Sequence, residues 1–216
     1  MTQHDDAQHA VTGGPATQEF WDERYASADQ VWSGEANGAL VREAAGLAPG
    51  QALDVGCGEG ADAVWLALRG WDVTALDVSP VALERAARHA GQARVKVRWV
   101  HSGLVGAPVA PGAFDLVSAQ YPALLRAPGH DAERALLAAV APGGTLLVVH
   151  HHPPIDAEQA RAHGFDPDDY VTPDDVAAQL DNAWQVKVKE IRARSVTTGA
   201  GSHHTHDLVL RAHRLR

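Results

Sequence analysis

Hydrophobic positions recur along the chain in two alternating patterns. Short apolar runs, rich in β-branched residues, occupy 52–56, 72–78, 95–100, 114–120 and 144–150. Segments with helical spacing lie between most of them, over 61–70, 79–90 and 130–141. Continuous apolar strands that alternate with helices are typical of a parallel sheet covered on both faces. The pattern therefore predicts an α/β fold built on five parallel strands.

The two ends of the chain depart from this alternation. Residues 16–28 and a shorter segment ending at Gly46 or Gly50 predict two helices before the first strand. After the fifth strand, a helix over 172–182 precedes a half-exposed strand over 183–196, a loop over 197–206 and a last strand over 207–215. Strands joined only by a loop should pair antiparallel. We expect a Rossmann-like, doubly wound sheet of seven strands that ends in an antiparallel hairpin.

Composition narrows the possible functions. The net charge of −9 over 216 residues argues against a nucleic-acid surface, because phosphate binding needs clustered Lys and Arg. No run of about 18 apolar residues occurs, so no membrane span is expected, and the polar N-terminus does not resemble a secretory signal. The single cysteine, Cys57, excludes an internal disulfide and fits a reducing compartment. A cytoplasmic location follows as the expectation.

Three glycines follow the first predicted strand, in the stretch DVGCGEG. Glycine at this place lets a ligand lie against bare backbone, at the edge where open α/β sheets bind ligands. The spacing of Gly56, Gly58 and Gly60 differs from the G-x-G-x-x-G of dinucleotide sites. Asp54 and Glu59 would repel a pyrophosphate and instead suit a cationic ligand that carries an amino group.

The second predicted strand ends in a carboxylate, Asp77. A carboxylate at this position can accept two hydrogen bonds from a ribose diol. The alternative is a solvated aspartate at the end of a strand.

Taken together, these motifs resemble a known family. LDVGCGEG, VTALDVSPVALERA, FDLVSAQY and APGGTLLVV follow the order of the motifs of class I S-adenosylmethionine-dependent methyltransferases. The resemblance implies S-adenosylmethionine as cofactor and S-adenosylhomocysteine as product. It also implies that strand seven inserts between strands five and six. The segment EFWDERYASADQVWSGEANGAL further resembles small bacterial enzymes of the tellurite-resistance and thiopurine methyltransferase kind, in which an aromatic helix and loop close over the cofactor.

The residue pattern and the resemblance together predict a division of the chain, and the resemblance, which spans roughly residues 18–150, implies a set of contacts. A disordered lead over 1–15 would precede one domain over 16–216, with cap helices over 16–50, a cofactor core over 51–150, and a substrate-side helix and hairpin over 151–216. Asp54 and the glycines would hold the methionine portion, and Asp77 the ribose. The alternative for the cap aromatics is that they merely pack as core. The residues expected to contact the cofactor are Trp21, Tyr25, Trp32, Asp54, Gly56, Cys57, Gly58, Asp77, Val78, Ser102, Gly103, Leu104 and Gln120.

Six of the thirteen histidines fall in two clusters, HHH at 150–152 and HHTH at 203–206. Both should face the substrate side of the cleft, because one follows strand five and the other joins the last two strands. Alternation along a strand should place His150 and His152 on one side and His151 on the other, and Asp207 is placed to orient an imidazole. Solvated loop histidines, a general base and a metal site all stay open. The residues predicted for catalysis are His150, His152, His203, His206 and Tyr121; no metal ligand is assigned.

The resulting hypothesis is a methyltransferase that passes a methyl group from S-adenosylmethionine to a small-molecule acceptor by in-line displacement. A noncatalytic S-adenosylmethionine-binding regulatory or partner protein is the alternative. A nicotinamide oxidoreductase is disfavoured by the glycine spacing and by Glu59. Neither a nucleic acid nor a membrane is expected as partner, and the sequence leaves the accepting atom and the oligomeric state open.

Overall fold

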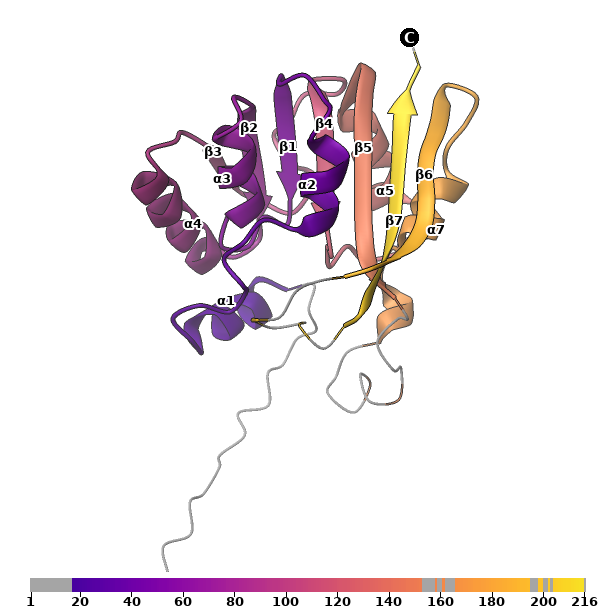
Figure 1. Cartoon of the computed structure of the whole chain (residues 1–216). Helices are drawn as coiled ribbons and strands as arrows, with labels where there is room; N and C mark the ends of the chain where they lie inside the picture. The colour runs from indigo at the N-terminus through magenta and orange to yellow at the C-terminus, as the bar shows by residue number, and fades with distance from the viewer. Residues whose placement is uncertain are drawn as a thin grey trace, which may run out of the picture.

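A computed structural model describes residues 17–152, 158, 161, 166–194, 198–199, 202 and 204–215. Its seven strands form one sheet in the order β3-β2-β1-β4-β5-β7-β6 (Figure 1). They are β1 (Gln51–Val55), β2 (Asp72–Asp77), β3 (Arg98–His101), β4 (Phe114–Gln120), β5 (Val140–His152), β6 (Trp184–Ala193) and β7 (His206–Arg214). β1 to β5 pair in parallel, and β7 pairs antiparallel with both β5 and β6. The predicted sheet is confirmed, including the insertion of the last strand; the predicted lead over 1–15 lies outside the described residues.

Helices cover both faces of this sheet (Figure 1). α2, α3 and α4 pack on one face, whereas α5 and α7 pack on the other. α1 lies instead beneath the carboxyl edge of the parallel strands. The bounds are α1 (Gln18–Ala26), α2 (Gly38–Ala44), α3 (Ala61–Ala67), α4 (Pro80–Ala93), α5 (Asp131–Ala139), a 3-10 turn η1 (Pro167–Asp169) and α7 (Pro173–Ala178).

Local signals account for where two of the helices begin. The Ser79 hydroxyl accepts a hydrogen bond from the Ala82 N–H, and Pro80 occupies the first helical position of α4. Thr172 and Asp175 form a reciprocal capping box at the start of α7. Both starts agree with the sequence patterns.

The central strands are buried on both faces, as their continuous apolar runs predicted. Leu53 and Leu146 belong to the cluster beneath α5 and α7, and Ala52 and Leu147 to the cluster beneath α2 and α3. Side-chain alternation therefore assigns each strand position to one core or the other. The carboxyl ends of β1, β2, β4 and β5 are consequently held rigidly at one edge, next to α1.

Candidate active site

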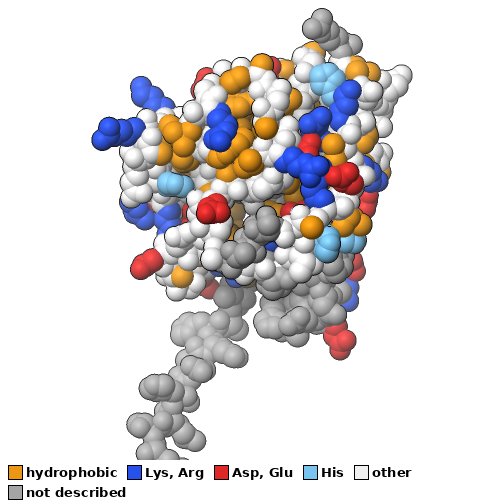
Figure 2. All heavy atoms as spheres, viewed as in Figure 1, with side chains coloured by type: hydrophobic (Ala, Val, Ile, Leu, Met, Phe, Trp, Pro, Cys, Tyr) orange, Lys and Arg blue, Asp and Glu red, His pale blue; other side chains and the backbone are white. Residues whose placement is uncertain are grey.

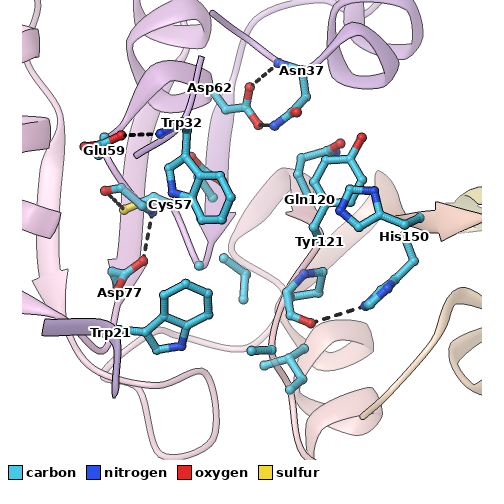
Figure 3. Close-up of a pocket in the computed structure, with 18 of the residues that line it drawn as sticks. Trp21, Trp32, Asn37, Cys57, Glu59, Asp62, Asp77, Gln120, Tyr121 and His150 are labelled. Carbon is cyan, nitrogen blue, oxygen red and sulfur yellow. Dashed lines mark hydrogen bonds between the residues drawn. The ribbon is translucent and has the colours of Figure 1, made fainter. Parts of the chain in front are cut away.

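A cavity of about 810 Å³ opens at this carboxyl edge, within the range of about 300–1,000 Å³ typical of ligand sites. Figure 3 shows Trp21, Trp32 and Asp77 on one side of it, and Tyr121 and His150 on the other. All of the residues expected to contact the cofactor line this cavity. The structure thus brings together segments from both halves of the chain.

The glycine loop takes backbone conformations that favour glycine. Gly56, Gly58 and Gly60 have φ angles of 70°, 52° and 83°. A Cβ at Gly58 would lie 2.9 Å from the Tyr25 hydroxyl and 3.3 Å from Trp32 Nε1, whereas a Cβ at Gly56 would meet nothing within 4 Å. The lack of a side chain at Gly58 therefore lets Tyr25 and Trp32 pack against the loop, and the lack of one at Gly56 leaves open space for a ligand.

Asp54, at the end of β1, presents an unsatisfied acceptor. Its side chain is 2% exposed, and among the described residues its Oδ2 has no hydrogen-bond partner. Burial raises the pKa of the Asp54 carboxyl well above its usual range, and the nearby carboxylates of Asp62 and Asp77 raise it further. A ligand that brings a positively charged donor would satisfy this oxygen. The neighbouring Asp62 is already satisfied by the backbone and side-chain N–H groups of Asn37, at 2.7 and 2.8 Å.

Asp77 is buried and fixed, so the alternative of a solvated aspartate is wrong. Its Oδ2 accepts from the Gly58 N–H at 2.8 Å, and its Oδ1 accepts from the Ser79 N–H at 2.9 Å. Burial raises the pKa of the Asp77 carboxyl, and these backbone bonds oppose the shift. Because each carboxylate oxygen can accept a second hydrogen bond, the side chain keeps capacity for two ligand hydroxyls.

Glu59 does not act as the sequence suggested. Its carboxylate accepts from the backbone N–H groups of Val31 and Trp32, at 3.2 and 3.0 Å, and pairs with Arg85 at 2.9 Å. The expectation that Glu59 serves a cationic ligand is therefore wrong, because these groups already neutralise it. Instead, Glu59 ties the N-terminal segment to the glycine loop.

The N-terminal aromatics form the outer wall of the cavity. Trp32 Nε1 donates to the Tyr25 hydroxyl at 3.0 Å, and the Trp21 ring lies 5.9 Å from that of Tyr25. Arg85 of α4 donates to the Tyr25 and Ala28 carbonyls, which holds the end of α1 against α4. Tyr25 is 3% exposed. The aromatics thus both line the cavity and pack as core.

A second group of cavity residues surrounds the ends of β2 and β3. The Ser102 N–H donates to the Asp77 carbonyl at 3.0 Å, and the Ser102 hydroxyl donates to the Gly103 carbonyl at 2.8 Å. Val78 lies 3.6 Å from the place of a Cβ at Gly103, and Leu104 is buried. Contact of these residues with adenine stays a prediction.

The opposite end of the cavity is built around Tyr121, which follows β4. Its hydroxyl donates to Asp207 Oδ1 at 2.9 Å, and its ring stacks on that of His151 with 4.2 Å between centroids. The His151 ring stacks in turn on His204, at 3.8 Å. The Arg194 guanidinium lies 4.9 Å from the Tyr121 centroid. A polar and aromatic cluster therefore faces the glycine loop.

The two histidine clusters do meet, but through other members than those predicted for catalysis. His151 and His204 form the contact, whereas His150 lies on the opposite face of β5, where its Nε2 is 3.4 Å from the Pro122 carbonyl. His152 lines the cavity. His206 is exposed and its ring nitrogen bonds the adjacent Thr205 hydroxyl at 2.9 Å, so its predicted approach to the cleft is wrong. His203 lies outside the described residues.

Sequence reasoning did not predict that Asp207 bonds Tyr121, nor that Arg194 and His204 join this cluster. In the register of β5 and β7, His151 lies directly opposite Asp207, so both project to the same face. The Tyr121 hydroxyl lies 2.9 Å from Asp207 Oδ1, whereas His151 Nδ1 lies 3.9 Å from the same oxygen.

Within the described ranges, no group of three or more His, Cys, Asp or Glu side chains is arranged to hold a metal ion. In the same part of the chain, no helix combines the length and apolarity needed to cross a membrane.

Residues 52–144 match the family model of a methyltransferase domain. An uncharacterized methyltransferase of Mycobacterium tuberculosis is 34% identical over 122 residues, which are 56% of this chain and 61% of that protein. Over this region the chain is similar to class I S-adenosylmethionine-dependent methyltransferases. The match thus spans less than two thirds of this relative. The finer resemblance of the N-terminal segment to the tellurite-resistance and thiopurine group stays a prediction.

Solved structures share the methyltransferase fold. A structure from work on the conversion of a disulfide bond into a thioacetal group during echinomycin biosynthesis has a TM-score of 0.72 and 24% identity, covering 92% of each chain. Geranyl diphosphate C-methyltransferase of Streptomyces coelicolor, solved with S-adenosyl-L-homocysteine, has a TM-score of 0.67 and 15% identity, covering 93% of this chain and 97% of that one.

S-adenosylmethionine, the cofactor of the methyltransferases that this chain resembles, fits the site. The unpaired oxygen of Asp54 offers an acceptor for its amino group, and the open space at Gly56 leaves room beside the backbone. Asp77 keeps acceptor capacity for the ribose.

Proposed function

We propose that this protein transfers a methyl group from S-adenosylmethionine to a small-molecule acceptor by in-line displacement. The observation that supports this most is one continuous cavity with a carboxylate-rich glycine loop at one end and the Tyr121 cluster at the other. When bound, the cofactor supplies an electrophilic methyl group. The protein then has to align an incoming lone pair with the carbon–sulfur bond and to exclude water.

At the cofactor end, the proposed roles follow from the hydrogen bonds left open. Asp54 would accept from the amino group of the methionine portion, and Asp77 would accept from the ribose while its backbone bonds keep it in place. Val78 and Leu104 would flank the adenine ring with apolar surface. The aromatic wall of Trp21 and Trp32 would cover the cofactor from the solvent side.

At the acceptor end, the lining favours a small apolar molecule. Pro122, Leu124 and Tyr170 contribute apolar surface to this part of the cavity. On the face seen in Figure 2, Lys and Arg side chains are interspersed with acidic ones and form no continuous basic surface of the kind that nucleic acids require. The geranyl diphosphate enzyme, a structural neighbour, acts on a small molecule.

The cytoplasmic location expected from the sequence also stays a prediction.

His150 is proposed to orient the acceptor. Burial lowers the pKa of its imidazole, so the ring is neutral near pH 7. Because a carbonyl only accepts, the contact with Pro122 places the hydrogen on Nε2 and leaves a lone pair on Nδ1. The Nδ1 lone pair of this neutral imidazole can accept a hydrogen bond from the acceptor and so hold it in the cavity.

Calorimetry combined with a methyl-release assay tests the proposal. S-adenosylmethionine and S-adenosylhomocysteine should bind with micromolar-scale affinity, NAD should not, and radiolabel from the methyl group should appear in a small-molecule product. Binding without transfer to any small nucleophile would favour the noncatalytic alternative. Stabilisation by NAD alone would overturn the whole assignment.

A further inference from the structure

Tyr121 is held in a conformation that a bulky residue rarely adopts. Its φ angle is 52°, in the left-handed region where the Cβ of a non-glycine residue approaches the following carbonyl oxygen unfavourably. The Tyr121 N–H still donates to the Val149 carbonyl at 2.8 Å, which anchors the residue at the end of β4. Strain of this kind persists where the surrounding structure fixes it, and it concentrates at functional sites.

The Tyr121 hydroxyl is fixed by a residue far away in the sequence. It donates to Oδ1 of Asp207 on β7, a carboxylate that is 4% exposed. Arg194 Nε and His151 Nδ1 lie 3.8 and 3.9 Å from the same oxygen. Since the hydroxyl proton points to Asp207, the lone pairs of the Tyr121 oxygen remain available to accept a hydrogen bond from a molecule in the cavity.

We infer that the Tyr121–Asp207 pair receives the proton of a phenolic acceptor, an inference that rests on the proposed methyl transfer. The acceptor oxygen forms a bond to the methyl carbon while the carbon–sulfur bond breaks, and sulfur keeps the electron pair. The proton of the acceptor passes to the Tyr121 oxygen as the Tyr121 proton passes to Asp207 Oδ1. Tyr121 therefore stays neutral, and Asp207 ends as the carboxylic acid.

The electrostatic surroundings agree with this proton path. Burial raises the pKa of the Tyr121 hydroxyl, and the Asp207 charge raises it further, which disfavours a free phenolate at Tyr121. Burial also raises the pKa of the Asp207 carboxyl, opposed by the Tyr121 hydrogen bond and by Arg194. A carboxylate whose pKa is raised is a better proton acceptor than an exposed one.

The pair and the cavity wall together select the acceptor class. Thiolates attack a methyl sulfonium without a base, so a built-in proton path suits a hydroxyl acceptor. A phenolic hydroxyl, with a pKa of about 10 like that of tyrosine, is the hydroxyl within reach of a carboxylate relay. Pro122, Leu124 and Tyr170 offer the apolar surfaces on which a planar ring can lie.

The experiment compares three acceptors that differ only in the nucleophilic atom: phenol, thiophenol and aniline. Wild type, Tyr121→Phe and Asp207→Asn are assayed with methyl-labelled S-adenosylmethionine, and the S-adenosylhomocysteine affinity of each is measured by calorimetry. Glu190→Gln removes an exposed carboxylate from the same hairpin and is the matched control. Phenylalanine keeps the stack on His151, and asparagine keeps an acceptor for Tyr121, so both variants should fold.

Phenol should be methylated by wild type and by Glu190→Gln, with turnover about 100-fold lower in both pair variants. In the same two variants, turnover of thiophenol and affinity for S-adenosylhomocysteine should change less than about threefold. A merely structural role of the pair would lower turnover of phenol and thiophenol alike. Equal losses for phenol and thiophenol would overturn the inference. So would wild-type methylation of thiophenol or aniline but not phenol, or product binding with no transfer to phenol. Absence of product binding would instead reject the proposed function itself.

Discussion

Asp54→Asn should raise the thermal stability of the unliganded protein and lower its affinity for the cofactor. Asparagine keeps an oxygen for the bond from the Ala63 N–H and removes the charge from the buried oxygen that lacks a partner. The unliganded variant is therefore relieved of the free-energy cost of burying a charged carboxylate close to those of Asp62 and Asp77. The complex loses the charge-assisted hydrogen bond that the proposed ammonium contact provides.

Both magnitudes follow from the burial of this side chain. An unsatisfied buried polar group costs about 1–3 kcal/mol; since the asparagine amide is itself buried and polar, we expect a gain at the low end, about 1 kcal/mol, or about 2–4 °C in Tm for a chain of this size. Loss of a hydrogen bond to a charged group, worth about 1.5–3 kcal/mol, should lower the cofactor affinity about 10- to 150-fold.

The pH dependence of the stability gain gives an independent check. Because the folded state raises the pKa of the Asp54 carboxyl, wild type bears no charge penalty below the unfolded pKa of about 4, and the penalty grows as the pH rises through the folded value. The advantage of the asparagine variant should therefore be present at about pH 7 and disappear near pH 4.

Thermal unfolding and calorimetry with S-adenosylhomocysteine measure the two effects. Asp72→Asn is the matched control, because Asp72 is exposed at the opposite end of the neighbouring strand, where it accepts from Gln51. Asp72→Asn should change neither quantity. An Asp54→Asn variant that binds the product like wild type, or that unfolds at a lower temperature at neutral pH, would refute the reasoning.

Three further outcomes are expected. Asp77→Asn should lower cofactor affinity at least about tenfold in calorimetry, since the amide loses one acceptor oxygen; unchanged affinity would remove Asp77 from the ribose site. Gly58→Ala should cost more stability in thermal unfolding than Gly56→Ala, by about 1 kcal/mol, because only the first adds contact with Tyr25 to the strain of a positive φ; equal losses would contradict the packing argument. Because burial lowers the pKa of His150, turnover should fall on acidification only below the usual value of about 6.5, where the protonated ring loses its acceptor lone pair; a loss already beginning above neutral pH would exclude His150 as the orienting group.

Local patterns predicted the sheet and the glycine loop because their signals lie within single segments. The positive φ angles from Gly56 to Gly60 and the buried strand before them are properties of adjacent residues. The partners of Glu59 were not predictable in this way, since its backbone donors lie 28 and 27 residues earlier in the chain. Local sequence carries no record of which distant N–H groups will approach a carboxylate.

The histidines show where periodicity stops being informative. Alternation along β5 correctly separated His150 from His151. Which of the two would face Tyr121 depends on how β7 pairs with β5, and that register places Asp207 opposite His151. The bond between Tyr121 and Asp207 spans 86 positions, so only the assembled sheet reveals it.

The close approach at Gly58 has a consequence for how this protein can diverge. The Tyr25 hydroxyl and Trp32 Nε1 occupy the space that any side chain at position 58 would need. A lineage that acquires a larger residue at 58 must therefore replace Tyr25 or Trp32 with a smaller residue. A lineage that loses both aromatics no longer has this steric clash, although the positive φ at position 58 still favours glycine. These three positions should consequently vary together among homologues, although they belong to segments that are far apart in the chain, whereas Gly56 should vary independently of them.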